Sequence, residues 1–283
     1  MDGRIVITGE GIISAIGNDK VAVAASLRRR QTGIEEMHYL PSSHHELPVG
    51  EVKLSNDELK TRLGLPLSKV VSRTTLLGIE AVRQALEQAH ILKRKSMRIV
   101  LISGTTVAGM DITEEVFRDM LEGKIPTTCL EHHQCGACTA DIAAYFGLFS
   151  DYTTISTACS SASNALILGA EMLKAGDADI VVAGGTEALS RFHLNGFNSL
   201  MILDHERCRP FDATRAGLNL GEGAAYVVLE REKDALLRGV KADAWLAGYG
   251  NACDAFHQTA SSSDDLGAQL SMRKALRMAS LTP

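Results

Sequence analysis

Residues 152–165 read Tyr152-Thr-Thr-Ile-Ser-Thr-Ala-Cys159-Ser-Ser-Ala-Ser-Asn-Ala165. The first half of this stretch is rich in β-branched residues, which favours a buried β-strand. From Ala162 to Lys174 the sequence turns to alanine and leucine, with apolar residues at helical spacing. We therefore expect a strand, a sharp turn at Cys159 and a helix that begins directly after it.

Cys159 is placed by this pattern at the junction of the strand and the helix. The first N–H groups of a helix have no intrahelical partner, and the positive end of the helix dipole lies there. A sulfur atom in that position is favoured as the thiolate, the form that acts as a nucleophile. Cys159 is therefore a candidate for covalent catalysis. The alternative is a buried structural cysteine, a frequent environment for a free thiol.

Further motifs follow this cysteine in a fixed order, namely Val181-Val-Ala-Gly-Gly-Thr-Glu-Ala188, Arg209-Pro-Phe-Asp212 and Gly221-Glu-Gly-Ala224. Together with Thr157-Ala-Cys-Ser-Ser161, they resemble the successive signatures of the β-ketoacyl-acyl-carrier-protein synthases in both order and spacing. The similarity runs from Ile5-Val-Ile-Thr-Gly9 to the end of the chain. It is closest to the elongating condensing enzymes of type II fatty-acid and polyketide synthesis.

The resemblance implies a thiolase-like α/β fold, in which two similar halves pack with their central helices between two sheets. Residues 1–241 then form the N-terminal half, which carries the nucleophile. Residues 242–283 form the start of the C-terminal half, so that the first half is complete and the second only begun.

Strand-like and helix-like segments alternate along the chain. The expected strands are Arg4–Thr8, Met97–Ser103, Thr153–Thr157, Ile180–Ala183, Ala224–Glu230 and Ala242–Gly250. The expected helices are Asn18–Arg30, Val70–His90, Ile112–Glu122, Cys135–Leu148, Ala162–Lys174, Glu230–Arg238 and Gly267–Met278. This alternation predicts a mostly parallel sheet layered with helices on both faces. Gln31–Pro66 and Arg191–Arg215 are expected to be irregular.

The resemblance also implies roles for particular residues. Cys159 would accept an acyl chain as a thioester, and the chain would then undergo decarboxylative Claisen condensation with a malonyl group on acyl carrier protein. Phe197 aligns with an aromatic residue of the acyl pocket, and plain core packing is the alternative. His257 matches a stretch near the substrate entrance, and a partly exposed loop histidine is the alternative.

Two catalytic histidines and a glycine-rich oxyanion loop complete the active site in this family. These groups belong to motifs of the second half, and no stretch before Pro283 matches them. We therefore expect residues 1–283 alone to be a fragment of a condensing enzyme that does not itself catalyse condensation.

The expected partners are acyl carrier protein, which delivers acyl and malonyl thioesters, and a second copy of the chain. In the family, the strand before the nucleophile pairs with its twin across a two-fold axis, and Tyr152–Thr157 is uncharged, as such an edge requires. A homodimer is thus expected, with a heterodimer left open. The alternative function is that of a non-catalytic chain-length partner subunit. Such subunits lack the nucleophile, so Cys159 favours the catalytic type.

Composition excludes several other classes of protein. The chain has 283 residues, enough for a large core, and its formal net charge is −5. Without a basic run, this charge argues against a nucleic-acid partner. No apolar run has the length of a signal peptide or a membrane span, so we expect a cytoplasmic protein with free thiols and no membrane association.

Two cofactor hypotheses fail because their motifs are incomplete. A zinc site could draw on Cys129, His132, His133, Cys135 and Cys138. However, a second C-x-x-C pair is missing, and the last two of these residues begin an amphipathic helix. Gly9-Glu-Gly-Ile-Ile-Ser14 resembles a dinucleotide fingerprint, but a serine replaces its third glycine. We therefore expect neither a metal nor a cofactor.

Overall fold

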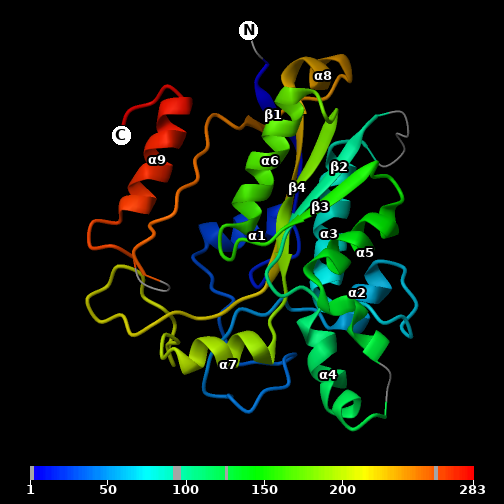
Figure 1. Cartoon of the computed structure of the whole chain (residues 1–283), viewed down its shortest axis with the longest axis vertical. Helices are drawn as coiled ribbons and strands as arrows, with labels where there is room; N and C mark the ends of the chain where they lie inside the picture. The colour runs from blue at the N-terminus through cyan, green and yellow to red at the C-terminus, as the bar shows by residue number, and fades with distance from the viewer. Residues whose placement is uncertain (1–2, 92–96, 125–126, 258–260) are drawn as a thin grey trace.

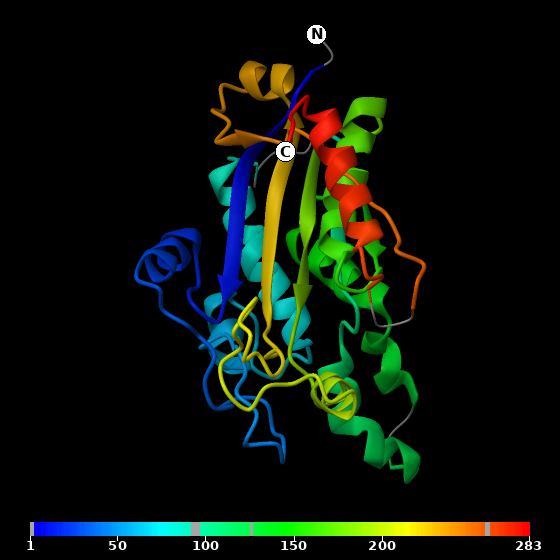
Figure 2. The same ribbon diagram turned by 90° about the vertical axis from the view of Figure 1, so that its left-hand side faces the viewer.

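The computed structural model describes residues 3–91, 97–124, 127–257 and 261–283. Within these residues one sheet has the strand order β3-β2-β4-β5-β1-β6 (Figure 1). The strands are β1 Ile5–Ser14, β2 Ile99–Gly104, β3 Asp151–Ile155, β4 Ile180–Glu187, β5 Gly223–Arg231 and β6 Ala244–Trp245. Figure 2 shows β1, β5 and β4 running side by side through the middle of the molecule.

The directions of these strands differ from the expectation, although the α/β class is as predicted. β2 runs parallel to β3 and β4, whereas β5 is antiparallel to β4 and to β1, and β6 is antiparallel to β1. The sheet is therefore mixed and not mostly parallel. The reason is the connection between β4 and β5: its helix α7, Arg191–Ser199, lies beyond the strand ends and does not cross the sheet (Figure 1). The chain then re-enters the sheet in the opposite direction.

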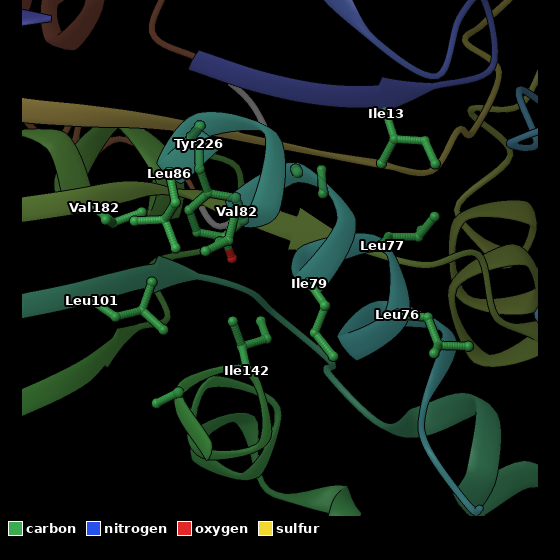
Figure 3. Packing of buried hydrophobic residues seen from close by; sticks show 14 of the residues in the cluster. Ile13, Leu76, Leu77, Ile79, Val82, Leu86, Leu101, Ile142, Val182 and Tyr226 are labelled. Atoms are coloured by element: carbon green, nitrogen blue, oxygen red, sulfur yellow. The ribbon is translucent and has the colours of Figure 1, made fainter. Parts of the chain in front are cut away.

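Helices cover both faces of the sheet. On one face lie α3, Arg73–Gln88, and α5, Cys135–Phe146, and on the other lies α6, Ser161–Ala175. Because successive residues of a strand point to opposite faces, each inner strand contributes to two hydrophobic cores. The larger core joins the sheet to α3 and α5 and includes Leu86, Leu101, Ile142, Val182 and Tyr226 (Figure 3). The smaller core joins the sheet to α6 and includes Val100, Ala165, Leu173 and Val181.

The remaining helices surround this frame. They are α1 Lys20–Arg28, α2 Asn56–Arg62, α4 Met110–Leu121, α8 Glu232–Leu237 and α9 Leu266–Met278, with a 3₁₀ turn over Thr127–His133. α2 and α7 lie in segments predicted to be irregular. Both are short and begin at a serine that caps the helix, Ser55 for α2 and Ser190 for α7. Because these segments are polar in composition, their sequences do not show the apolar spacing by which a helix is predicted.

β3 is an edge strand, and the expectation that it is buried is wrong for this chain by itself. Asp151, Tyr152 and Thr153 are exposed, and Thr154 and Ile155 are half-buried. Among the described residues, β3 has only β2 as a neighbour in the sheet, which leaves one side of the strand open.

The last forty residues contain less strand than expected, since β6 covers only Ala244–Trp245 of the predicted Ala242–Gly250. α9 packs closely on the segment that follows β6, where the Gly248 and Gly250 backbones approach the helix (Figure 1). The division of the chain at residue 241 stays a prediction. Among the described residues, no helix is both long and apolar enough to cross a membrane.

Candidate active site

A cavity of about 520 Å³ lies at the carboxyl ends of β2 and β4. It is lined by the loop 105–107, the turn 158–162, residues of α7 and the segment 220–223. Cys159 is one of the lining residues and is exposed to solvent. A thiol that faces an open cavity is accessible to a substrate, in contrast to the buried structural cysteine considered as the alternative.

The turn that carries Cys159 is held by hydrogen bonds on both sides of the sulfur. The Thr157 N–H donates to Ser161 Oγ at 2.9 Å, and the Ser161 hydroxyl donates to the Ala158 carbonyl at 2.7 Å. Ala158 has a φ of +51°, in the left-handed region that non-glycine residues rarely adopt. This turn places Cys159 at the N-terminal end of α6, as the sequence predicts.

Two glycines allow α6 to begin so close to the sheet. A Cβ atom on Gly104, at the end of β2, would lie 2.5 Å from the Ala162 nitrogen. A Cβ atom on Gly185 of β4 would lie 2.9 Å from the Ala162 Cβ. Both positions thus require glycine for this close approach, which fixes the height of Cys159 above the strand ends.

Glu187, the last residue of β4, holds the loop that forms another part of the cavity. Its carboxylate accepts hydrogen bonds from the Thr105 hydroxyl at 3.0 Å, the Thr106 N–H at 2.5 Å and the Val107 N–H at 3.4 Å. Both oxygens therefore have donors. The carboxylate positions the loop beside Cys159, a role that sequence analysis did not assign.

A buried ion pair holds the segment 220–223. The Glu222 carboxylate accepts from Arg73 Nη2 at 2.6 Å and from the backbone N–H groups of Val52 and Leu189 at 2.9 and 3.1 Å. The Arg73 guanidinium also donates to the Leu54 carbonyl. This network connects α3, the start of α7 and the rim of the cavity.

α7 provides the aromatic wall of the cavity through Phe192, His193 and Phe197. Phe197 lines the cavity, and its proposed contact with an acyl chain stays a prediction. His193 was not singled out by sequence analysis. The spacing of four residues between His193 and Phe197 on one helix puts both on the same face, a signal available from the sequence once α7 is recognised.

His257 is exposed and does not belong to the residues that line this cavity. It follows β6 in a segment without regular structure. Its proposed place near a substrate entrance stays a prediction.

The cysteines and histidines considered for zinc are dispersed. Cys135 donates to the Thr106 carbonyl at 3.1 Å, and Cys138 is buried, which raises the pKa of its thiol to about 12. His132 pairs with Asp141 at 3.3 Å, and the side chain of Cys129 lies outside the described residues. Across the part of the chain that the structure describes, no group of three or more His, Cys, Asp or Glu side chains could hold a metal ion.

Comparison with known proteins agrees with this geometry. The family described as "Beta-ketoacyl synthase, N-terminal domain" matches residues 2–235. The chain belongs to the β-ketoacyl synthase family. The resemblance drawn from the motifs around Cys159 is confirmed.

Relatives of this β-ketoacyl synthase include nodulation protein E of Rhizobium meliloti strain 1021, at 32% identity over 92% of the chain and 66% of that protein. A second relative is 3-oxoacyl-[acyl-carrier-protein] synthase 2 of Staphylococcus aureus strain COL, at 27% identity over 99% of the chain and 70% of that protein. The chain thus spans about two thirds of the length of the relatives that it matches.

Solved structures with the same fold are ketosynthases. The ishigamide ketosynthase/chain length factor has a TM-score of 0.88 at 27% identity, covering 99% of this chain and 70% of that one. The ketosynthase ApeO in complex with its chain length factor ApeC from Xenorhabdus doucetiae has a TM-score of 0.83 at 27% identity, covering 99% and 69%. The β-ketoacyl synthase described here therefore has the predicted thiolase-like fold.

Proposed function

We propose that this chain takes part in fatty-acid or polyketide-type synthesis by holding an acyl chain on Cys159 as a thioester. The observation that carries the proposal is the position of Cys159, which is exposed in a cavity with aromatic walls and lies next to Ser160, the N-cap residue of α6. Membership of the β-ketoacyl synthase family supports the same chemistry.

The loading step is a thioester exchange. The Cys159 thiolate attacks the carbonyl carbon of an acyl thioester and forms a new carbon–sulfur bond. The bond to the carrier's sulfur breaks, and the carrier leaves as a thiolate that takes up a proton. Because one thioester replaces another, the exchange is nearly balanced in free energy.

Condensation then joins the loaded acyl group to a malonyl unit. The malonyl thioester loses carbon dioxide, and the resulting enolate attacks the carbonyl of the Cys159 thioester, which releases the sulfur as a thiolate. Hydrogen-bond donors must stabilise the enolate, and by the family resemblance these donors belong to motifs that residues 1–283 do not contain. We therefore propose that this chain supports loading and does not by itself support condensation.

The cavity fits an acyl chain. Phe197 and Phe192 give it aromatic walls, and a cavity of about 520 Å³ is within the range of small-molecule sites. In the proposed function Phe197 contacts the acyl chain, His257 lies near the entrance, and acyl carrier protein delivers the thioester. A homodimer formed through β3 completes the assembly.

The alternative function is that of a chain-length partner subunit without catalysis. Its support is that two of the similar structures are complexes of a ketosynthase with a chain length factor. Loading of Cys159 separates the two functions, because a partner subunit of that kind has no need of a reactive thiol.

The test is a condensation assay with purified residues 1–283, an acyl carrier protein loaded with a medium-length acyl chain, and malonyl carrier protein. We expect transfer of the acyl group to the chain and no ketoacyl product at a useful rate, since loss of even one enolate-stabilising donor costs about 10²–10³-fold. Formation of ketoacyl product at a normal rate would overturn the proposal that condensation needs donors that residues 1–283 do not contain. If no acyl group is transferred to the chain, the alternative function of a non-catalytic partner subunit is favoured.

A further inference from the structure

The wall formed by α7 depends on support from outside the helix. α7 has nine residues, Arg191–Ser199, and a helix of that length is not stable in water by itself. Its exposed side chains include Phe192, which also lines the cavity. The position of Phe192 and Phe197 therefore depends on the contacts that anchor the helix.

Glu114 of α4 provides the main polar anchor of α7. Its carboxylate accepts the Arg191 N–H at 3.0 Å, Arg191 Nε at 3.3 Å and the Phe192 N–H at 2.5 Å. Arg191 Nη2 also donates a hydrogen bond to the backbone carbonyl of Glu114 at 2.8 Å. The Glu114 side chain is only 13% exposed, so this carboxylate is held in place and largely shielded from water.

These contacts occupy N–H groups that a helix leaves unpaired in its first turn. Glu114 takes the first two, and the Ser190 hydroxyl oxygen accepts the third, from His193, at 3.2 Å. A negative charge at this end also interacts favourably with the helix dipole. The start of α7 is thus defined by a side chain from another helix.

The same anchor connects two walls of the cavity. α4 begins at Met110, directly after the lining loop 105–107 that Glu187 holds. Glu114 lies one turn further along α4 and binds the start of the aromatic wall. The distance between the loop and α7 is therefore set through α4 and the Glu114–Arg191 pair.

We propose that Glu114, paired with Arg191, is a positioning residue that fixes α7 as the wall selecting acyl chains by length. The inference rests on the proposed function, because it presumes that Cys159 carries a chain that packs against Phe192 and Phe197. Each methylene group of the acyl chain that contacts α7 adds affinity, so the preference for chain length depends on the position of this helix.

The test uses alkylation, which needs no other catalytic group. Residues 1–283 are treated with iodoacetamide or with N-octyl-iodoacetamide, and the rate of modification at Cys159 is measured by peptide mass spectrometry. The quantity of interest is the ratio of the octyl rate to the iodoacetamide rate. The variants are Glu114→Ala, Glu114→Gln and, as a matched control, Asp179→Ala.

Asp179 is a suitable control because it makes similar contacts far from the cavity. It accepts the Arg98 N–H and Arg98 Nη2, both at 2.9 Å, at the end of β2 opposite to the cavity. Glu114→Gln keeps an oxygen that accepts from the helix start and removes the charge.

We expect the natural chain to prefer the octyl reagent, and Glu114→Ala to lower the ratio at least about threefold, since small displacements of a positioning group have large effects on rate. The iodoacetamide rate should stay within about twofold, because Cys159 is held by its own turn. Glu114→Gln should fall between, and Asp179→Ala should match the natural chain.

An unchanged ratio in Glu114→Ala, or an equal change in Asp179→Ala, would overturn the inference and leave the proposed function intact. Should Glu114→Ala fail to fold, Glu114→Gln decides by the same ratio, with an unchanged ratio overturning the inference. A natural chain that alkylates at Cys159 without preferring the octyl reagent would overturn both the acyl pocket and the inference.

Discussion

Arg73 and Glu222 form the buried ion pair on which the rim of the cavity depends. Their side chains are 9% and 1% exposed. Removing one charge of such a pair leaves the other buried without compensation, which is strongly destabilising. Glu222 stands between Gly221 and Gly223, and both glycines line the cavity. The ion pair therefore contributes to the stability of the fold and to the shape of the site.

We predict that Glu222→Gln lowers the free energy of unfolding by about 3–5 kcal/mol, because the Arg73 guanidinium loses its carboxylate partner. The matched control is Glu232→Gln, which removes the exposed partner of Arg4 at 3.9 Å and should cost less than about 1 kcal/mol. Urea unfolding of both variants measures the difference. Equal losses would contradict the structural role of the buried pair.

Asp111 gives the protein a distinctive dependence on pH. Its Oδ2 accepts the Arg73 N–H at 2.7 Å, whereas Oδ1 is buried and has no hydrogen-bond partner among the described residues. Burial raises the pKa of Asp111 to about 6 from an ordinary value of 3.8. The folded protein therefore binds a proton between these values that the unfolded chain has lost. The resulting stabilisation is complete below about pH 4 and disappears as the pH rises through 6.

We predict that Asp111→Asn removes this component of the pH dependence. Between pH 5 and pH 7.5 the natural chain should lose about 1.4 kcal/mol more unfolding free energy than the variant, which corresponds to about one pKa unit. Urea unfolding at the two pH values measures this change, and other titrating groups cancel in the comparison. Identical changes in both proteins would show that Asp111 titrates normally.

At the scale of elements, the junction of β2 and α6 is the tightest contact near the nucleophile. We predict that Gly104→Ala displaces the first turn of α6, because the new Cβ would lie 2.5 Å from the Ala162 nitrogen. The cost should be about 1–3 kcal/mol, with slower acylation of Cys159. Gly136→Ala in α5 is the control, since its Cβ would meet no atom of the described residues within 4 Å.

The control should be neutral or stabilising by up to about 1 kcal/mol, as expected for replacing a helical glycine with alanine. Urea unfolding and the rate of Cys159 acylation provide the two measurements. Equal behaviour of the two variants would mean that close packing at Gly104 does not position α6.

β3 offers an open edge on which a second copy can pair. Tyr152 is 49% exposed, β3 carries no charge after Asp151, and an unpaired edge strand of this kind is prone to association. We predict a dimer at micromolar concentration and a shift toward monomer in Tyr152→Lys, because the two added charges meet across the two-fold axis. Val21→Lys on α1 also replaces an exposed apolar residue and should stay dimeric. Sedimentation measures both, and a monomeric natural chain would contradict the pairing.

The sequence predicted the elements with strong periodicity and missed those that depend on tertiary contacts. The helix after Cys159 was expected at Ala162–Lys174 and is found at Ser161–Ala175. α7 was missed because its segment is polar and because Glu114, far away in the sequence, accepts its first two N–H groups. The antiparallel return of β5 was also missed, since alternation of strands and helices does not reveal which helices cross the sheet.

At the scale of the whole molecule, the motifs predicted the family and the fold, and the structure brings Cys159 and Phe197 to one cavity. The supporting carboxylates Glu187, Glu222 and Glu114 could not be assigned roles from sequence, because the backbone N–H groups and arginine side chains that they bind lie far away in the sequence. Such partners leave no local pattern. The motif thus predicts the cysteine in the cavity, whereas contacts between distant segments of the chain determine the shape of the cavity.

The central claim is that Cys159 carries the acyl chain, and peptide mapping after incubation with an acyl carrier protein thioester tests it most directly. We expect the acyl mass on the peptide that contains Cys159, and no acyl mass on this peptide in Cys159→Ala. Cys253, which is also exposed, serves as an internal control and should stay unmodified. An acyl group on Cys253 or Cys135 in place of Cys159, or the same total acylation in Cys159→Ala, would contradict the account.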